Sequence, residues 1–439
     1  MRNRLPLMFI TLILIAGILA CGISAQTAPT QTPPNPPSGP STAAAAVVPT
    51  IGMVPTAALT ARPVVSTTPA PVPPEYQAMY KQIKAGLDAV KAAYAGQTGP
   101  APLFAAELSY ANGNVGPALL NPAVLDLVRL QLDQLSQIGV GGVVLAIKFP
   151  MLEPDFPRSA EYLQFFKQVA AEVHQRNMKL LVESGALFSG TIFSPLTVDW
   201  SRYPNAQAFR LAEIHQLQTI ATEIRPDYLQ IANEPTTTAM LTHFVDSPAD
   251  YAAFVRLAFS AIPPQPGMLL GAGAGTWENQ AFVTGLFDIP GLDFIDLHVY
   301  PVGANGGMLS LVASLAQQAH AAGKRAVISE AWLYKIGSGS AFQASDFTSA
   351  IGRDTFSFWE PLDEEFIQDL TAVSRAGGIE FVSFFWVREF YAYLDFAQYH
   401  AASPAQLNQA ITTLSVANSR QQIYSPLGLF FQAWIIRSK

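Results

Sequence analysis

The feature that most constrains this 439-residue chain is a regular alternation between short apolar runs and longer amphipathic segments. Runs that are apolar throughout are typical of parallel strands, because helices cover both faces of a parallel sheet. The runs span residues 102–109, 142–149, 178–183, 228–233, 268–272, 294–299, 326–330 and 381–386. Segments with helical periodicity lie between them, and another precedes the first run. Eight strand–helix units predict a (β/α)8 TIM barrel.

An open, doubly wound sheet is the main structural alternative to a closed barrel. The stretch Gly271-Ala-Gly-Ala-Gly275 has some likeness to a dinucleotide-binding loop. However, Thr276 stands where the third glycine belongs, and no ribose-binding acid is evident downstream. We therefore favour the barrel and expect no dinucleotide cofactor.

The first 21 residues have the pattern of a bacterial lipoprotein signal peptide. Arg2 and Arg4 precede an apolar core at residues 5–20, which is short for a membrane span. The core ends in Leu-Ala-Cys-Gly, and Cys21 is the only cysteine of the chain. This ending resembles a lipobox, in which the cysteine is lipidated. An ordinary signal peptide and an uncleaved anchor are the alternatives, and all three place the protein outside the cytoplasm.

Composition divides the rest of the chain into two parts. Residues 22–74 are rich in Pro, Thr and Ala, which favours an extended linker without a core of its own. Residues 75–439 contain the strand–helix units and form the predicted barrel domain. The acidic stretch at residues 359–365 is interpreted as a solvated insertion, and the apolar segment at residues 427–436 is expected to pack on the barrel exterior.

Charge and histidine spacing exclude several classes of partner. The net charge is −7 and no basic patch is evident, so nucleic acid is not an expected partner. The six histidines are scattered without the spacing of metal ligands, so no metal site is expected. No feature indicates an oligomer, and a monomer is expected.

Polar and aromatic side chains gather at the carboxyl ends of the eight runs. A barrel brings all these ends to one face, where the active sites of such barrels lie. The residues concerned are Glu107, Lys148, Glu183, Asn233, Glu234, His298, Tyr300, Glu330, Trp332 and Trp386.

Two carboxylates on different strands, with aromatic rings nearby, are the groups that glycoside hydrolysis requires. One carboxyl group must be protonated, so that it can donate to the leaving oxygen. The other must be ionised, so that it can attack the anomeric carbon, and different surroundings can hold two identical groups in these two states. Glu234 and Glu330 are the candidates, with Glu183 and Glu107 as the alternative partners of Glu234. This chemistry needs neither a metal nor another cofactor.

These two segments resemble clan A of the glycoside hydrolases, which includes cellulases, mannanases, galactanases and xylanases. Asn233-Glu234-Pro235 ends the fourth run, and Ile-Ser-Glu-Ala-Trp, which contains Glu330, ends the seventh. The resemblance implies a (β/α)8 barrel in which Glu234 is the acid/base and Glu330 the nucleophile. It also implies net retention of configuration at the anomeric carbon.

The resemblance extends to four further site residues. It implies that Asn233 binds the sugar 2-hydroxyl, that His298 lines the site and that Tyr300 holds the nucleophile. It also implies that Trp386 forms the floor under the cleaved sugar. Trp332 is a candidate sugar platform, with a core position as the alternative.

The ends of the second and third runs depart from the clan. Lys148 and Glu183 lie where many members have an arginine and a His or Asn. An ion pair in the barrel mouth is the structural interpretation of these two residues.

The sequence thus predicts a surface-tethered lipoprotein whose barrel is a retaining glycoside hydrolase of β-linked sugars in an extracellular oligo- or polysaccharide. The rival hypothesis is a non-catalytic, carbohydrate-binding lipoprotein with a degenerate glycosidase barrel, and the departures at Lys148 and Glu183 motivate it. A transporter-linked solute receptor would also fit a lipid anchor, but not eight strand–helix units.

Overall fold

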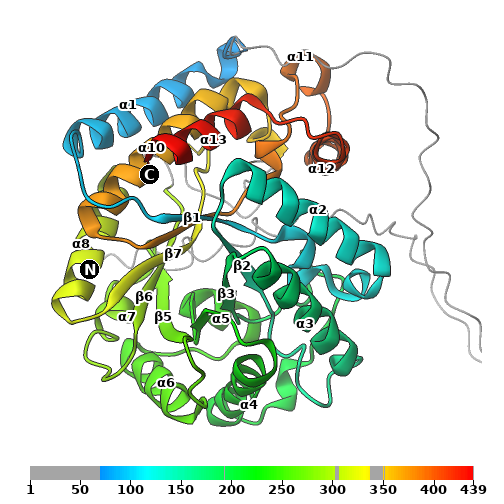
Figure 1. Cartoon of the computed structure of the whole chain (residues 1–439), viewed down its shortest axis with the longest axis vertical. Coiled ribbons are helices and arrows are strands. Elements are labelled where there is room, and N and C mark those ends of the chain that lie inside the picture. Colours follow the sequence, from blue (N-terminus) through cyan, green and yellow to red (C-terminus); the bar gives the residue numbers. More distant parts are fainter. Residues whose placement is uncertain (1–69, 192, 302–305, 337–349, 351, 439) are drawn as a thin grey trace, which may run out of the picture.

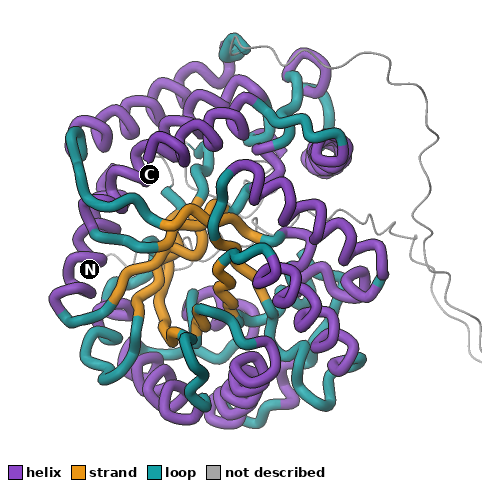
Figure 2. The backbone as a smooth tube through the Cα atoms, viewed as in Figure 1, coloured by secondary structure: helices purple, strands orange, loops and turns teal. Residues whose placement is uncertain are grey.

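The computed structural model describes residues 70–191, 193–301, 306–336, 350 and 352–438 (Figure 1). The predicted signal segment with Cys21, and nearly all of the predicted linker, lie outside this part. Eight parallel strands hydrogen-bond in chain order, and β8 pairs with β1, which closes the predicted barrel (Figure 2). The strands are β1 (Leu103–Glu107), β2 (Gly142–Ala146), β3 (Lys179–Glu183), β4 (Tyr228–Gln230), β5 (Leu269–Gly275), β6 (Phe294–Val299), β7 (Arg325–Ala331) and β8 (Phe381–Phe384).

Helices surround the barrel and connect successive strands (Figure 1). The helices are α1 (Gln77–Ala93), α2 (Pro122–Ile138), α3 (Ser159–Gln175), α4 (Ala206–Thr219), α5 (Pro235–Thr242), α6 (Pro248–Ala261), α7 (Ala281–Thr284), α8 (Gly306–Ala321), α10 (Glu360–Gly377), α11 (Phe396–Tyr399), α12 (Pro404–Arg420) and α13 (Pro426–Ser438). Short α5, which follows Glu234 directly, is not predicted from the sequence. No helix in the described ranges combines the length and apolar character that a membrane crossing requires.

The interpretation of residues 359–365 as a solvated insertion is wrong. Glu360–Gly377 forms α10, and α10 packs against α1, α8 and α13. Trp359 is completely buried and stacks on Tyr80 of α1, with 5.9 Å between the ring centroids. The charged residues of the first turn misled the prediction, because helices added at both ends of the domain cover this turn. The apolar C-terminal segment forms α13 and packs on the exterior as expected.

The interior of the barrel is layered. A buried cluster from six strands fills its lower part: Ala105, Val144, Leu181, Phe294, Val327 and Phe381. Because side chains alternate along a strand, the residues two positions further on point inward as well. Five of those six are polar and buried, namely Glu107, Glu183, Asp296, Ser329 and Ser383, and Gln230 of β4 lies two positions after Tyr228, which packs against the cluster. A polar layer therefore lies above an apolar floor and below the carboxyl ends of the strands.

The glycines of residues 271–275 belong to strand β5, not to a nucleotide-binding loop. Gly273 pairs with Asp296 of β6, and a β-carbon added to Gly273 would lie 1.8 Å from the Asp296 carbonyl oxygen. The ring of Phe294 occupies the space that a β-carbon on Gly271 would need. Glycine is thus required here because β5 and β6 approach closely.

We expect Gly273→Ala to destabilise the domain by about 1–3 kcal/mol or more, since the methyl group forces β5 and β6 apart. Urea unfolding of residues 75–439 measures the change. Gly285→Ala is the control, because its added methyl would come no closer than 3.0 Å to the nearest atom. Equal effects of the two substitutions would contradict the close approach of β5 and β6.

Candidate active site

A pocket at the carboxyl ends of the strands brings together four of the predicted site residues. Asn233 and Glu234 follow β4, Tyr300 follows β6, and Glu330 lies in β7; all four line the pocket. Lys148, which follows β2, lines it too. The strand ends therefore converge as the barrel topology predicts.

One imidazole connects the two predicted catalytic carboxylates. Nδ1 of His298 lies 2.6 Å from Oε1 of Glu234 and 3.4 Å from Oε2 of Glu330. These two carboxylate oxygens are therefore at most about 6 Å apart, the sum of the two distances. All three side chains are buried or nearly so.

Tyr300 is fixed beside Glu330. Its hydroxyl donates a hydrogen bond of 2.7 Å to Oε2 of Glu330. Burial and the negative charge of Glu330 raise the pKa of Tyr300 well above its usual value, so the hydroxyl keeps its proton and remains a donor.

The turn between β4 and α5 holds Asn233 and Glu234 in place. Pro235 is the first residue of α5, which suits a helix start because proline lacks the backbone N–H. Nδ2 of Asn233 donates to Oε1 of Gln230 at 3.0 Å, and the Tyr251 hydroxyl donates to the Asn233 carbonyl at 2.8 Å. One step further, the backbone N–H of Thr236 donates to Oε1 of Glu278 at 2.8 Å.

The polar layer supports His298 from below. Asp296 accepts hydrogen bonds from the backbone N–H and the hydroxyl of Ser329, and Ser329 Oγ lies 3.0 Å from Nε2 of His298. Gln230 also donates to Asp296. Burial alone would lower the pKa of His298, but the charge of Glu330, together with Asp296 and Glu234, raises it well above 6.5. The surrounding carboxylates therefore favour the imidazolium form of His298.

Sequence reasoning missed most of this support. Gln230, Asp296 and Ser329 lie inside strands, where an apolar residue is expected at every inward position. The sequence feature that could have identified them is a polar residue at an inward position of a buried strand. Burying a polar group costs free energy unless hydrogen-bond partners offset the cost.

Lys148 and Glu183 form the ion pair expected in the barrel mouth, with 3.3 Å between Nζ and Oε1. Burial and Glu330 raise the pKa of Glu183 to about 7, although Lys148 opposes the shift. Burial and Glu330 also raise the pKa of Glu107, whose carboxylate accepts a hydrogen bond of 2.6 Å from Asn112. Both carboxyl groups therefore keep a proton at weakly acidic pH.

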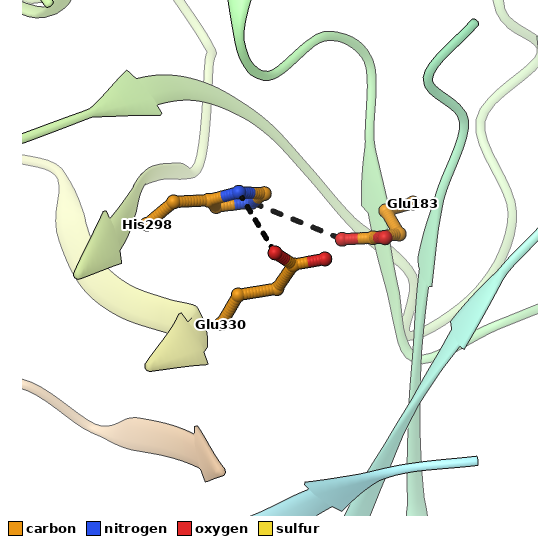
Figure 3. A group of neighbouring side chains, drawn as sticks. All are labelled: Glu183, His298 and Glu330. Carbon is orange, nitrogen blue, oxygen red and sulfur yellow. Dashed lines mark ion pairs between the residues drawn. The ribbon is translucent and has the colours of Figure 1, made fainter. Parts of the chain in front are cut away.

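Glu183, His298 and Glu330 form a compact cluster, and each offers one ligand-type atom within 4.8 Å of the other two (Figure 3). Both nitrogens of His298 already contact oxygens, from Glu234 on one side and Ser329 on the other. The cluster could therefore hold a cation only if His298 gave up a present contact. Lys148 already supplies positive charge to it.

The two predicted tryptophans lie outside the pocket lining. Trp332 is 1% exposed and lies beside the ammonium of Lys335, 5.4 Å from the ring centroid. Trp386 is 3% exposed, and the guanidinium of Arg388 covers its ring at 4.4 Å. Phe385, one residue earlier, lines the pocket. Phe188 and Leu241 also line the pocket. No feature of the sequence distinguishes these two apolar residues from those of the core.

Comparison with known proteins confirms the barrel. No protein-family model matches the chain, and no curated protein matches it either. Among solved structures, an exo-β-1,4-mannosidase from Opitutaceae bacterium strain TAV5 aligns over 77% of this chain and 60% of its own, with 15% identity and a TM-score of 0.50. This chain thus spans less than two thirds of that enzyme.

Two further solved structures align less closely. A protein described as GH5_18 from Bifidobacterium longum matches at 13% identity and a TM-score of 0.48, covering 76% of this chain and 79% of its own. A rutinosidase from Aspergillus niger matches at 11% identity and a TM-score of 0.42, covering 65% and 89%. At 15% identity, the mannosidase alignment shows a shared fold and no more.

We expect the His298 ring to carry both protons at pH 8. The surrounding carboxylates stabilise the imidazolium, so its positive charge persists well above pH 6.5. Ring nitrogen NMR shifts of ¹⁵N-histidine-labelled protein report the protonation state directly. Asp296→Asn should lower the His298 pKa because it removes one of these charges, whereas a neutral ring at pH 7 in the wild type would contradict the electrostatic account.

Proposed function

We propose that the barrel domain is a retaining glycoside hydrolase that cleaves β-linked sugars in an extracellular glycan. The observation that carries the proposal is the pair Glu234 and Glu330, which line one pocket with oxygens at most about 6 Å apart. Retaining enzymes have carboxyl groups about 5–5.5 Å apart, whereas inverting enzymes need about 6.5–9.5 Å to admit a water molecule.

The neighbours of each carboxylate suit a different role. Glu330 accepts the hydrogen bond of Tyr300, so its ionised form is stabilised as the nucleophile that bonds to the anomeric carbon. Glu234 gives a proton to the leaving oxygen as the glycosidic bond breaks. His298 supports this step, because its Nδ1–H donates to Glu234 across 2.6 Å, so the ring supplies the proton that Glu234 passes to the leaving oxygen and is left neutral. In the second step water attacks the anomeric carbon, transfers its proton to Glu234 and releases Glu330.

The pocket lining favours a sugar ligand but needs to rearrange around it. Phe188 and Phe385 offer flat apolar surfaces of the kind on which sugar rings pack. The free volume is about 20 Å³, enough for a water molecule and too small for a sugar ring. Substrate binding therefore requires lining side chains to shift.

We further propose that the domain works outside the cytoplasm as a monomer tethered to the membrane. Lipidated Cys21 would be the anchor, and residues 22–74 the spacer. This proposal rests on the pattern of residues 1–21 and on the low charge of the linker.

The first experiment measures hydrolysis of 4-nitrophenyl β-glycosides, β-mannosides among them, by residues 75–439. We expect activity with at least one sugar. Glu330→Ala should lose about 10³-fold or more in turnover, because the covalent intermediate can no longer form. Added azide should then attack from the vacated side and give the α-glycosyl azide. Glu234→Ala with azide should give the β-glycosyl azide, because the enzyme-bound intermediate still forms.

Glu213→Gln is the control, since Glu213 is a buried carboxylate that pairs with Arg210 and does not line the pocket. It should leave turnover within about twofold of the wild type. Azide products of the same configuration from both alanine variants would contradict the assigned roles. Sugar binding without hydrolysis by the wild type would instead establish the carbohydrate-binding alternative.

A further inference from the structure

Lys148 presents hydrogen-bond donors that none of the described residues uses. The residue is 5% exposed and lines the pocket. An ammonium group has three N–H donors. In the described part of the chain, the one side-chain acceptor that Nζ contacts is Oε1 of Glu183 at 3.3 Å. A buried ammonium with unused donors costs free energy, so such a group in a binding pocket points to a ligand oxygen.

An unused acceptor lies beside these donors. The amide nitrogen of Asn233 donates to Gln230, which leaves Oδ1 without a partner among the described residues. Gly185 lies next to both groups: a β-carbon there would be 3.2 Å from Oδ1 of Asn233 and 3.8 Å from Nζ of Lys148. The missing side chain at Gly185 therefore leaves Lys148 and Asn233 facing one common space on the pocket wall.

We propose that Lys148 is a substrate-binding residue that donates to hydroxyl oxygens of a neutral sugar, next to the hydroxyl that Asn233 contacts. The proposal rests on the glycosidase function proposed above and adds a specificity to it. Neighbouring hydroxyls of a sugar ring both accept and donate, which matches an ammonium beside an amide oxygen. Tyr300 cannot replace this donor, because its proton is committed to Glu330.

The charges around Lys148 select against acidic sugars. Burial disfavours the ammonium, but Glu183, Glu330, Glu234 and Glu107 more than offset this and raise the pKa of Lys148 above its usual value. The positive charge is thus already compensated by carboxylates of the protein. An additional carboxylate on the substrate would lie near Glu234 and be repelled by it.

The test compares binding of matched neutral and acidic ligands. The probes are 4-nitrophenyl β-D-glucoside with its glucuronide, and the β-D-galactoside with its galacturonide. Calorimetric titrations use residues 75–439 with Glu330→Gln, a substitution that prevents turnover and keeps the shape of the side chain. We expect at least one neutral probe to bind more tightly than its acidic counterpart.

Lys148→Met in this background should weaken binding of the neutral probe about 10- to 100-fold, the usual range for a hydrogen bond to a charged group. It also leaves Glu183 without its counterion. Adding Glu183→Gln removes that carboxylate, and urea unfolding should then show stability restored. Affinity should stay low, because the donor to the sugar is still missing.

Recovered affinity in the variant with both substitutions would mean that Lys148 serves as the counterion of Glu183, and would overturn the inference. Tighter binding of a uronide than of its neutral partner would overturn it as well. Binding without turnover by the wild type would overturn the proposed hydrolysis and leave the role of Lys148 standing. Failure of all four probes to bind would overturn both proposals.

Discussion

The whole site depends on the repulsion between carboxylates that share a small volume with little water. Ionised groups of like sign cannot all persist there, so some must keep a proton and others must gain a cationic partner. The structure uses both means. Glu107 and Glu183 have raised pKa values, and His298 and Lys148 supply buried positive charge. The distribution of protons among these groups decides which carboxyl group can act as an acid.

The layered interior of the barrel stabilises this buried cluster of charged groups. The polar layer formed by Gln230, Asp296 and Ser329 holds His298 in one orientation, so the ring does not have to reorganise when charge moves. The apolar floor below keeps the strands together without any contribution from the site. The apolar floor thus stabilises the fold and the polar layer supports the chemistry. The two sets of residues lie on the same strands, two positions apart in the chain.

The barrel and the pairing of the two predicted catalytic carboxylates follow from the sequence, because the apolar runs and the polar residues at their ends are local features. Apolar runs identify the strands, and a parallel barrel places every strand end on one face, which brings Glu234 and Glu330 together. Which of two adjacent aromatic residues enters the pocket is not a local property. Phe385 lines it and Trp386 does not, because the turn after β8 directs Trp386 toward Arg388. The burial of the start of α10 could not be predicted from the local sequence either, because helices that are distant in the chain cover it.

The start of α1 lies at the end of the barrel that carries the pocket. Tyr76 stacks on Phe358 at 5.3 Å and meets Phe396 edge-on at 5.8 Å. Phe358 follows β7 and Phe396 follows β8, so the chain joins the barrel on the same face as the pocket. Substitutions in this aromatic cluster would therefore act at the open end of the barrel, although α1 precedes every strand in the chain.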